Sequence, residues 1–99
     1  MRIGIIDDER PARSELRYQL EEMDPELEIV EGNSGTEAVR IVTEESLDLL
    51  FLDINLGDMN STALVPALQK LQPEMMICFV TAYSDYAVQA FNLEVDDYV

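Results

Sequence analysis

Three acidic side chains stand where this chain could do chemistry. Asp7 and Asp8 follow the apolar run IGII, and Asp53 ends the apolar run LLFL. A charge without a partner at the end of a buried segment is costly, so these carboxylates need something positive nearby. Together with a carbonyl from Asn55, they form an all-oxygen donor set that suits Mg²⁺, and Asp53 is a candidate nucleophile for phosphoryl transfer.

Each of these acidic residues also has an ordinary structural explanation. Asp is favoured before and within the first turn of a helix, so Asp7 and Asp8 could be helix caps. Asp53 could be a turn residue that ends a strand. Thr81 follows the apolar run MMICFV, and its hydroxyl could either contact a phosphoryl oxygen or form a turn ahead of the next helix.

The composition excludes several classes of function. No histidine is present and Cys78 is the only cysteine, so a His-based triad and a cysteine zinc site are both unavailable. The net charge of −15, with only six Lys and Arg in 99 residues, argues against direct nucleic-acid binding. The sequence has no apolar run of about 18 residues and no signal peptide, which predicts a soluble, cytoplasmic chain without membrane contact.

Strand-like and helix-like patterns alternate along the chain. Short apolar runs at residues 3–6, 27–30, 49–52 and 75–80 are typical of strands buried on both faces, and residues 95–99 form a weaker fifth candidate. Helical patterns lie between them, and they begin at Pro11, at the capping box of residues 34–37, near Ala63 and near Ser84. This alternation predicts parallel βαβ units in an α/β, doubly wound sheet.

The helical periodicity also predicts which side chains face the core. The first helix is expected to bury Ala12, Leu16, Leu20 and Met23, and the third to bury Ala63, Leu64, Ala67, Leu68 and Leu71. In doubly wound sheets, ligands bind beyond the carboxyl ends of the strands. If the first and third strands are neighbours, Asp7, Asp8 and Asp53 meet there, and two charges about 5 Å apart would repel by about 3 kcal/mol.

These pieces, in this order, resemble the receiver domain of bacterial two-component response regulators. The matching segments are IIDDE with Asp7 and Asp8, LLFLDINL with Asp53, VTA with Thr81, and DDYV with Tyr98. The resemblance covers the whole chain, so residues 1–99 are expected to be one receiver domain. The stretch FVTAYSDYAVQAFNLEVDDYV is further similar to regulators of the LytTR type (LytR/AlgR), although no DNA-binding output domain follows here.

The resemblance implies a flavodoxin-like, five-stranded sheet in the order 2-1-3-4-5. It also implies that Asp53 accepts a phosphoryl group from a sensor histidine kinase, with Mg²⁺ held by Asp7, Asp8, Asp53 and the main-chain carbonyl of Asn55. Such a domain signals and is not an enzyme, apart from weak self-catalysed phosphorylation and dephosphorylation. Thr81 and Tyr98 would be the switch pair that remodels the face formed by the fourth helix and the fifth strand.

The chain departs from the family pattern in the loop after Asp53. The family usually has proline and glycine where this chain has Gly57 and Ser61, which predicts a looser loop.

A second departure concerns the end of the sequence. The family places a phosphate-pairing lysine just beyond Tyr98, but this sequence stops at Val99. Lys70 lies at the end of the third helix and cannot replace it, whereas Arg10 is a candidate cation. The fifth helix is also absent, so we expect a truncated domain with slow or absent phosphorylation that forms a homodimer or a swapped oligomer through its open apolar face.

Two alternative functions remain. One is a protein-interaction or dimerisation module that works without phosphorylation and uses the face around Tyr83, Tyr86, Ala90 and Tyr98. The other is a Mg²⁺-dependent phosphohydrolase with an aspartyl nucleophile. Such enzymes typically carry a second acid two residues after the nucleophile, where this chain has Asn55.

Overall fold

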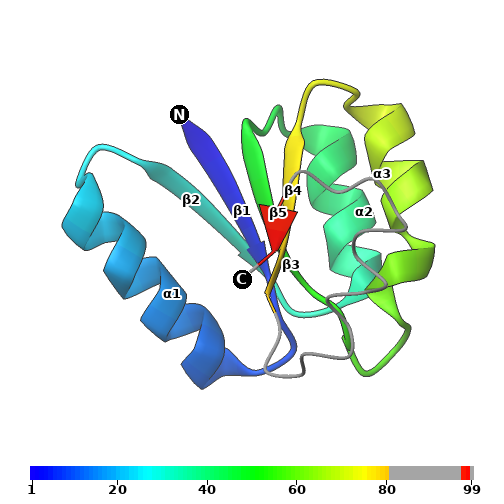
Figure 1. The fold of residues 1–99 in the computed structure, drawn as a ribbon, viewed down its shortest axis with the longest axis horizontal. Helices are drawn as coiled ribbons and strands as arrows, with labels where there is room; N and C mark the ends of the chain where they lie inside the picture. Colours follow the sequence, from blue (N-terminus) through cyan, green and yellow to red (C-terminus); the bar gives the residue numbers. More distant parts are fainter. Residues whose placement is uncertain (81–96, 99) are drawn as a thin grey trace.

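The computed structural model describes residues 1–80 and the backbone of residues 97–98. It forms a parallel sheet with helices on both faces (Figure 1). The elements are β1 (Arg2–Ile6), α1 (Arg10–Met23), β2 (Glu28–Gly32), α2 (Gly35–Glu44), β3 (Leu49–Asp53), the 3₁₀ helix η1 (Ser61–Ala63), α3 (Val65–Leu71), β4 (Met76–Val80) and β5 (Asp97–Tyr98). The expected fourth helix near Ser84 lies outside the described residues.

The strand order confirms the predicted parallel α/β class. Four strands lie in the order β2-β1-β3-β4, with every neighbouring pair parallel, and the two residues of β5 pair beside β4. Ile6 stands opposite Leu52 in the register of β1 and β3. Because these two strands are neighbours, the residues that follow them emerge at the same edge of the sheet.

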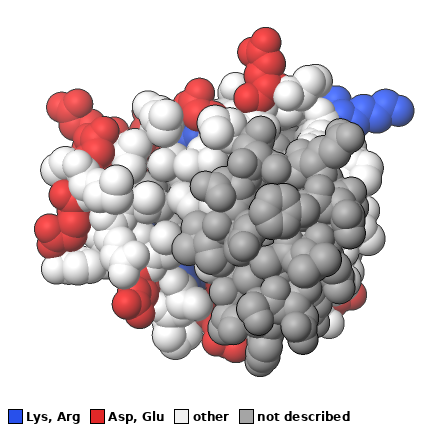
Figure 2. All heavy atoms as spheres, viewed as in Figure 1, with Lys and Arg blue, Asp and Glu red and all other residues white. Residues whose placement is uncertain are grey.

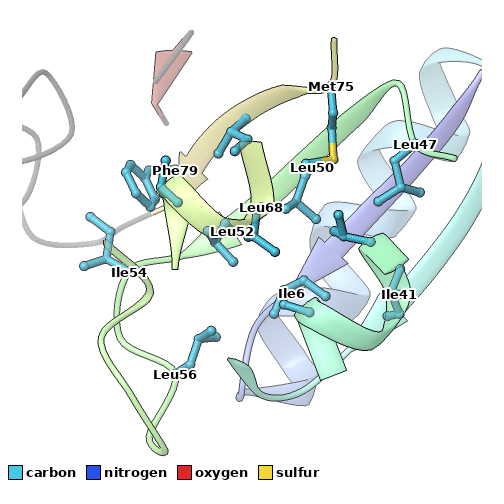
Figure 3. Packing of buried hydrophobic residues seen from close by; sticks show 14 residues of the cluster. Ile6, Ile41, Leu47, Leu50, Leu52, Ile54, Leu56, Leu68, Met75 and Phe79 are labelled. Carbon is cyan, nitrogen blue, oxygen red and sulfur yellow. The ribbon is translucent and has the colours of Figure 1, made fainter. Parts of the chain in front are cut away.

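The two faces of the sheet bury different amounts of apolar surface. In Figure 1, α2 and α3 cover one face, and α1 covers the other. The first face carries the larger core, in which Ile41 of α2 and Leu68 of α3 pack with strand residues such as Leu52 and Phe79 (Figure 3). On the α1 face, the buried cluster consists of Ile3, Ile5, Leu20, Phe51 and Cys78, so Cys78 is a core residue.

The predicted core face of the first helix is partly wrong. Leu20 of α1 is buried, but Ala12 is exposed and Met23 is 82% exposed. At 1.5 Å per residue, the 14 residues of α1 extend for about 21 Å, whereas a five-residue strand extends for about 17 Å. The helix is longer than the strands it covers, so its end residues project beyond them.

The residues predicted to form the third helix belong to two separate elements, η1 and α3. Ala63 belongs to the 3₁₀ helix η1, and α3 starts at Val65. Pro66 fits only in a first helical turn because it has no N–H to donate, and this fixes the start of α3. Leu68 is fully buried as expected, whereas Ala67 is exposed and Leu71 is 47% exposed.

Acidic side chains form most of the charged surface on the face shown in Figure 2, in keeping with the net charge of −15. Among the helices of the described residues, none has the length and apolar character needed to cross a membrane.

Candidate functional site

The first two acids of the site follow β1 directly. The strand pairs on both sides with other strands up to Ile6, and the N–H of Asp7 then donates to the carbonyl of Gly32 at 3.2 Å, which extends the contact with β2. Asp7 is only 8% exposed, and its Oδ1 accepts the N–H of Glu9 at 2.9 Å in a turn that leads into α1. Asp8 is exposed at the mouth of the site. The capping interpretation therefore explains neither Asp7 nor Asp8, because the N-cap of α1 is Glu9 and no side chain caps this helix.

Asp53 is the last residue of β3 and is partly buried. One carboxylate oxygen from each of Asp7, Asp8 and Asp53 can be chosen so that all three lie within 4.8 Å of one another. The sequence prediction that these three side chains meet is therefore correct. It follows from the order of the strands, because β1 and β3 are neighbours and end at the same edge.

The three carboxylates are in an unfavourable electrostatic environment. Burial raises the pKa of Asp53 to about 7, and the charges of Asp7 and Asp8 add to this effect. The N–H of Asn55, which lies 3.3 Å from Oδ1 of Asp53, opposes the rise of the pKa but does not cancel it. Without a cation, a substantial fraction of Asp53 is protonated near neutral pH.

Within the described residues, no ion pair neutralises the three carboxylates. Arg13 is the basic side chain held nearest to Asp7, but its Nη1 donates to the main-chain carbonyl of Asp7 at 2.6 Å and its Nε pairs with Glu31 at 3.2 Å. Arg10, the candidate cation, is exposed and takes part in none of the described ion pairs. Lys70 lies in the last turn of α3, as expected.

The donor set fits a hard divalent cation. Carboxylate oxygens from Asp7, Asp8 and Asp53 are the ligands preferred by Mg²⁺ and Ca²⁺, and a cation among them would relieve their repulsion. Mg²⁺ usually keeps several waters, so a few protein oxygens at an open edge are sufficient. Asn55 is exposed beside this cluster and contacts it through its N–H.

The loop that follows Asp53 is a hydrogen-bonded hairpin, and its predicted looseness stays a prediction. Gly57 has φ = +79°, a conformation that proline cannot adopt, and it forms the turn of a small hairpin. Ser61 is fully buried, and its hydroxyl donates to main-chain carbonyls at the end of β3. Where the family usually has proline and glycine, the loop of this chain is thus held by the turn at Gly57 and by the hydrogen bonds of the Ser61 hydroxyl.

The hairpin also contacts the start of α2. Ser34 accepts the N–H of Glu37 at 3.1 Å, which confirms the predicted cap, and Asp58 of the hairpin accepts the N–H of Gly35 at 3.0 Å. The thioether of Met59 lies against Gly35, so a Cβ at this position would require the flexible Met59 side chain to move. The loop beside the carboxylates is therefore attached to a helix on the α2–α3 face.

Sequence reasoning missed Arg13, Asp58 and Ser61. Nothing in the periodicity marks Arg13 as different from the other arginines of α1, although its place near the start of this helix could have suggested a contact with the turn at Asp7. Thr81 and the side chains of Tyr83, Tyr86, Ala90 and Tyr98 lie outside what the structure describes. Only the backbone of Tyr98 is described, and it pairs with Phe79.

Comparisons with known proteins identify relatives of the whole chain. The family model of the response regulator receiver domain matches residues 3–99. The transcriptional regulatory protein LytR of Staphylococcus aureus (strain N315) is 41% identical over 99 residues, which is all of this chain and 40% of that protein. The chain thus spans about two fifths of the length of this curated relative.

Solved structures show the same fold. TrrA, a response regulator protein of Thermotoga maritima solved with Mg²⁺ and BeF, superposes with a TM-score of 0.89 at 30% identity, over 99% of this chain and 84% of that one. A response regulator of Burkholderia pseudomallei, with a phosphorylated aspartic acid, calcium and citrate, gives a TM-score of 0.86 at 26% identity, over 98% of this chain and 57% of that one.

Proposed function

Since the chain belongs to the response regulator receiver domain family of two-component systems, we propose that Asp53 is its phosphoacceptor. The observation that carries this proposal is the convergence of Asp7, Asp8 and Asp53 within 4.8 Å at the carboxyl edge of the sheet. Of the three, Asp53 alone ends a central strand, so its main chain is held by the sheet while its side chain faces the open edge. A nucleophile benefits from such a rigid support.

The chemistry is the transfer of a phosphoryl group from the phosphohistidine of a sensor kinase. An oxygen of the Asp53 carboxylate forms the new bond to phosphorus, the bond between phosphorus and the imidazole nitrogen breaks, and the imidazole keeps the electron pair. The product is an acyl phosphate on Asp53. Mg²⁺ bound by Asp7, Asp8, Asp53 and the Asn55 carbonyl would keep Asp53 deprotonated and offset the charge of the incoming phosphoryl oxygens.

The raised pKa of Asp53 supports a role for a cation. With a pKa of about 7, the carboxylate is a mixture of protonated and deprotonated forms in the metal-free protein near neutral pH, and only the deprotonated form is nucleophilic. A divalent cation removes this limitation because it favours the charged form.

The response to phosphorylation would use Thr81 and Tyr98. Thr81 directly follows β4 in the sequence, and the backbone of Tyr98 pairs with Phe79 of β4. We propose that the Thr81 hydroxyl binds the phosphoryl group and that the Tyr98 ring changes position in response, as the family resemblance implies.

A small phosphodonor tests the proposal directly. Phosphoramidate contains a P–N bond like that of phosphohistidine, so incubation with Mg²⁺ should slowly add the mass of one phosphoryl group to part of the protein, detected by intact mass spectrometry. The added group should be lost on treatment with hydroxylamine, which cleaves acyl phosphates, and should be absent from Asp53→Asn and from samples with EDTA.

The matched control for this experiment is Asp48→Asn. Asp48 directly precedes β3, and Asp53 is the last residue of the same strand, so the two variants carry the same chemical change at opposite ends of one strand. The control should be labelled like the unaltered chain. Complete labelling of Asp53→Asn would refute the assignment of the phosphoacceptor.

A further inference from the structure

The loop after Asp53 is a small antiparallel hairpin. The N–H of Ser61 donates to the carbonyl of Ile54 at 2.8 Å, and the N–H of Leu56 donates to the carbonyl of Met59 at 3.2 Å. Asn55 and Asn60 form the bridge between these two hydrogen bonds. The chain reverses at Gly57, where the N–H of Asp58 donates to the carbonyl of Leu56 at 2.8 Å, and the positive φ of Gly57 explains the glycine.

This pairing determines where the main chain of Asn55 points. The hydrogen bonds come from the residues on either side of Asn55, so Asn55 and Asn60 form a non-hydrogen-bonded pair. In such a pair, the N–H and C=O of each residue point away from the partner strand. The N–H of Asn55 reaches Oδ1 of Asp53 at 3.3 Å, so its carbonyl leaves the hairpin on the side of the carboxylates.

A buried hydroxyl joins the hairpin to the end of β3. Ser61 is 0% exposed, and its Oγ lies 2.5 Å from the carbonyl oxygen of Asp53 and 2.9 Å from that of Ile54. The hydroxyl proton is thus shared between the main chain of the phosphoacceptor and that of the next residue. Glycine, which the family usually has here, could make neither contact.

We propose that Ser61 is a positioning residue of the metal site, whose hydroxyl holds the hairpin of residues 54–61 in the form that directs the Asn55 carbonyl toward Asp53. The inference rests on the proposed function, because it assumes that this carbonyl is a metal ligand. Ser61 acts through the main chain of Asp53 and touches neither metal nor phosphoryl group. The hairpin turn at Gly57 and the hydroxyl at Ser61 together take the place of the family's proline and glycine.

Ser61→Ala tests the inference, and Thr62→Ala is its matched control. Thr62 donates its hydroxyl to Oδ1 of Asn60 at 2.6 Å within the same loop, but the structure gives it no contact with Asp53. Isothermal titration of the full chain with Mg²⁺ should show about three- to tenfold weaker binding for Ser61→Ala, as expected for one lost hydrogen bond. Thr62→Ala should bind like the unaltered chain.

A spectroscopic measurement separates positioning from simple loss of stability. Saturating Mg²⁺ should shift the carbonyl ¹³C resonance of Asn55 in the unaltered chain, and the shift should be smaller in Ser61→Ala even when all of the protein is folded and loaded. Amide hydrogen exchange at Leu56 should be faster in Ser61→Ala, because the hairpin opens more often.

The outcomes distinguish the inference from the function on which it rests. If Ser61→Ala keeps both the Mg²⁺ affinity and the Asn55 shift while the unaltered chain binds Mg²⁺, the inference is wrong and the proposed function stands. If the unaltered chain binds no Mg²⁺, the metal site itself fails, and the role of Ser61 fails with it.

Discussion

The acidic residues at the two ends of the parallel sheet differ in whether they pair with an arginine. At the amino ends of the strands, Arg2 serves two carboxylates: its Nη2 lies 2.7 Å from Oε2 of Glu28, and its main-chain N–H donates to Oδ2 of Asp48 at 2.8 Å. Glu28 and Asp48 thus each have a partner within the chain, and the contacts join the starts of β1, β2 and β3.

At the carboxyl ends, three acids share one small space. Asp7, Asp8 and Asp53 lie within 4.8 Å of one another, and none of the ion pairs in the described part of the chain includes them. Their nearest arginine instead holds the backbone of Asp7. The comparison teaches that carboxylates of this fold are paired with arginine at one end of the sheet and grouped without an ion pair at the other, which supports the cation site proposed above.

The largest predicted effect is stabilisation by Mg²⁺. A ligand that binds only the folded state at about one hundred times its dissociation constant stabilises that state by about 2.7 kcal/mol. Urea denaturation near pH 8 should therefore show a higher free energy of unfolding with Mg²⁺ than with EDTA. An equal gain from NaCl at matched ionic strength would mean that the carboxyl end only needs general screening, like any acidic surface.

The second effect concerns the individual ligands. Asp8→Asn removes a charge from the mouth of the site and should weaken Mg²⁺ binding by about tenfold or more. Asp48→Asn, made at the amino end, should leave the affinity unchanged. Titration calorimetry measures both, and equal losses in the two variants would erase the distinction between the two ends of the sheet.

The third prediction uses the pKa of Asp53. Because this pKa is raised from 3.8 to about 7, the folded state binds more protons than the unfolded state between these values, and the free energy of unfolding should fall as the pH rises from about 4 to 7. Asp53 is only partly buried, so solvent screening reduces the effect to about 1 kcal/mol. In the metal-free protein at pH 7, Asp53→Asn should be more stable by this amount.

A pH series of urea titrations in EDTA measures the third effect, and its slope between pH 4 and 7 should be flatter in Asp53→Asn. Since the other carboxyl groups titrate in both proteins, only the difference between the two curves is informative. A variant as pH-dependent as the unaltered chain would show that Asp53 has an ordinary pKa.

The smallest effect is expected at the amino end. Arg2→Gln removes the ion pair with Glu28, which lies at the exposed surface, and should change stability little and the Mg²⁺ affinity not at all. Thermal unfolding and titration calorimetry are the measurements. A loss of Mg²⁺ affinity in this variant would reveal a coupling between the two ends that the described contacts do not contain.

Much of this contrast could be predicted from the sequence because strand patterns are local. Continuous apolar runs mark β1 and β3, and the three acidic residues lie at the ends of these runs. The single assumption that the two strands are parallel neighbours was therefore enough to predict that Asp7, Asp8 and Asp53 meet. The helix ends were less predictable. Met23 fits the helical period of α1, but it is the last residue of a helix that is longer than the strands, and it is therefore exposed.

The loop after Asp53 could not be predicted because its restraints are not periodic. Compared with the family's proline and glycine, Gly57 and Ser61 predicted a looser loop. In the structure, Gly57 permits a tight hairpin turn, and the buried hydroxyl of Ser61 donates to main-chain carbonyls. The role of Ser61 depends on which carbonyls lie within reach of its hydroxyl in three dimensions. Thr81 and the side chain of Tyr98 remain predictions.

The close approach of Met59 to Gly35 constrains how this domain can evolve. A side chain at position 35 would collide with the thioether, whereas a shorter residue at position 59 would make room for one. Substitutions at the two positions should therefore occur together: bulk gained on the helix would be balanced by bulk lost from the loop.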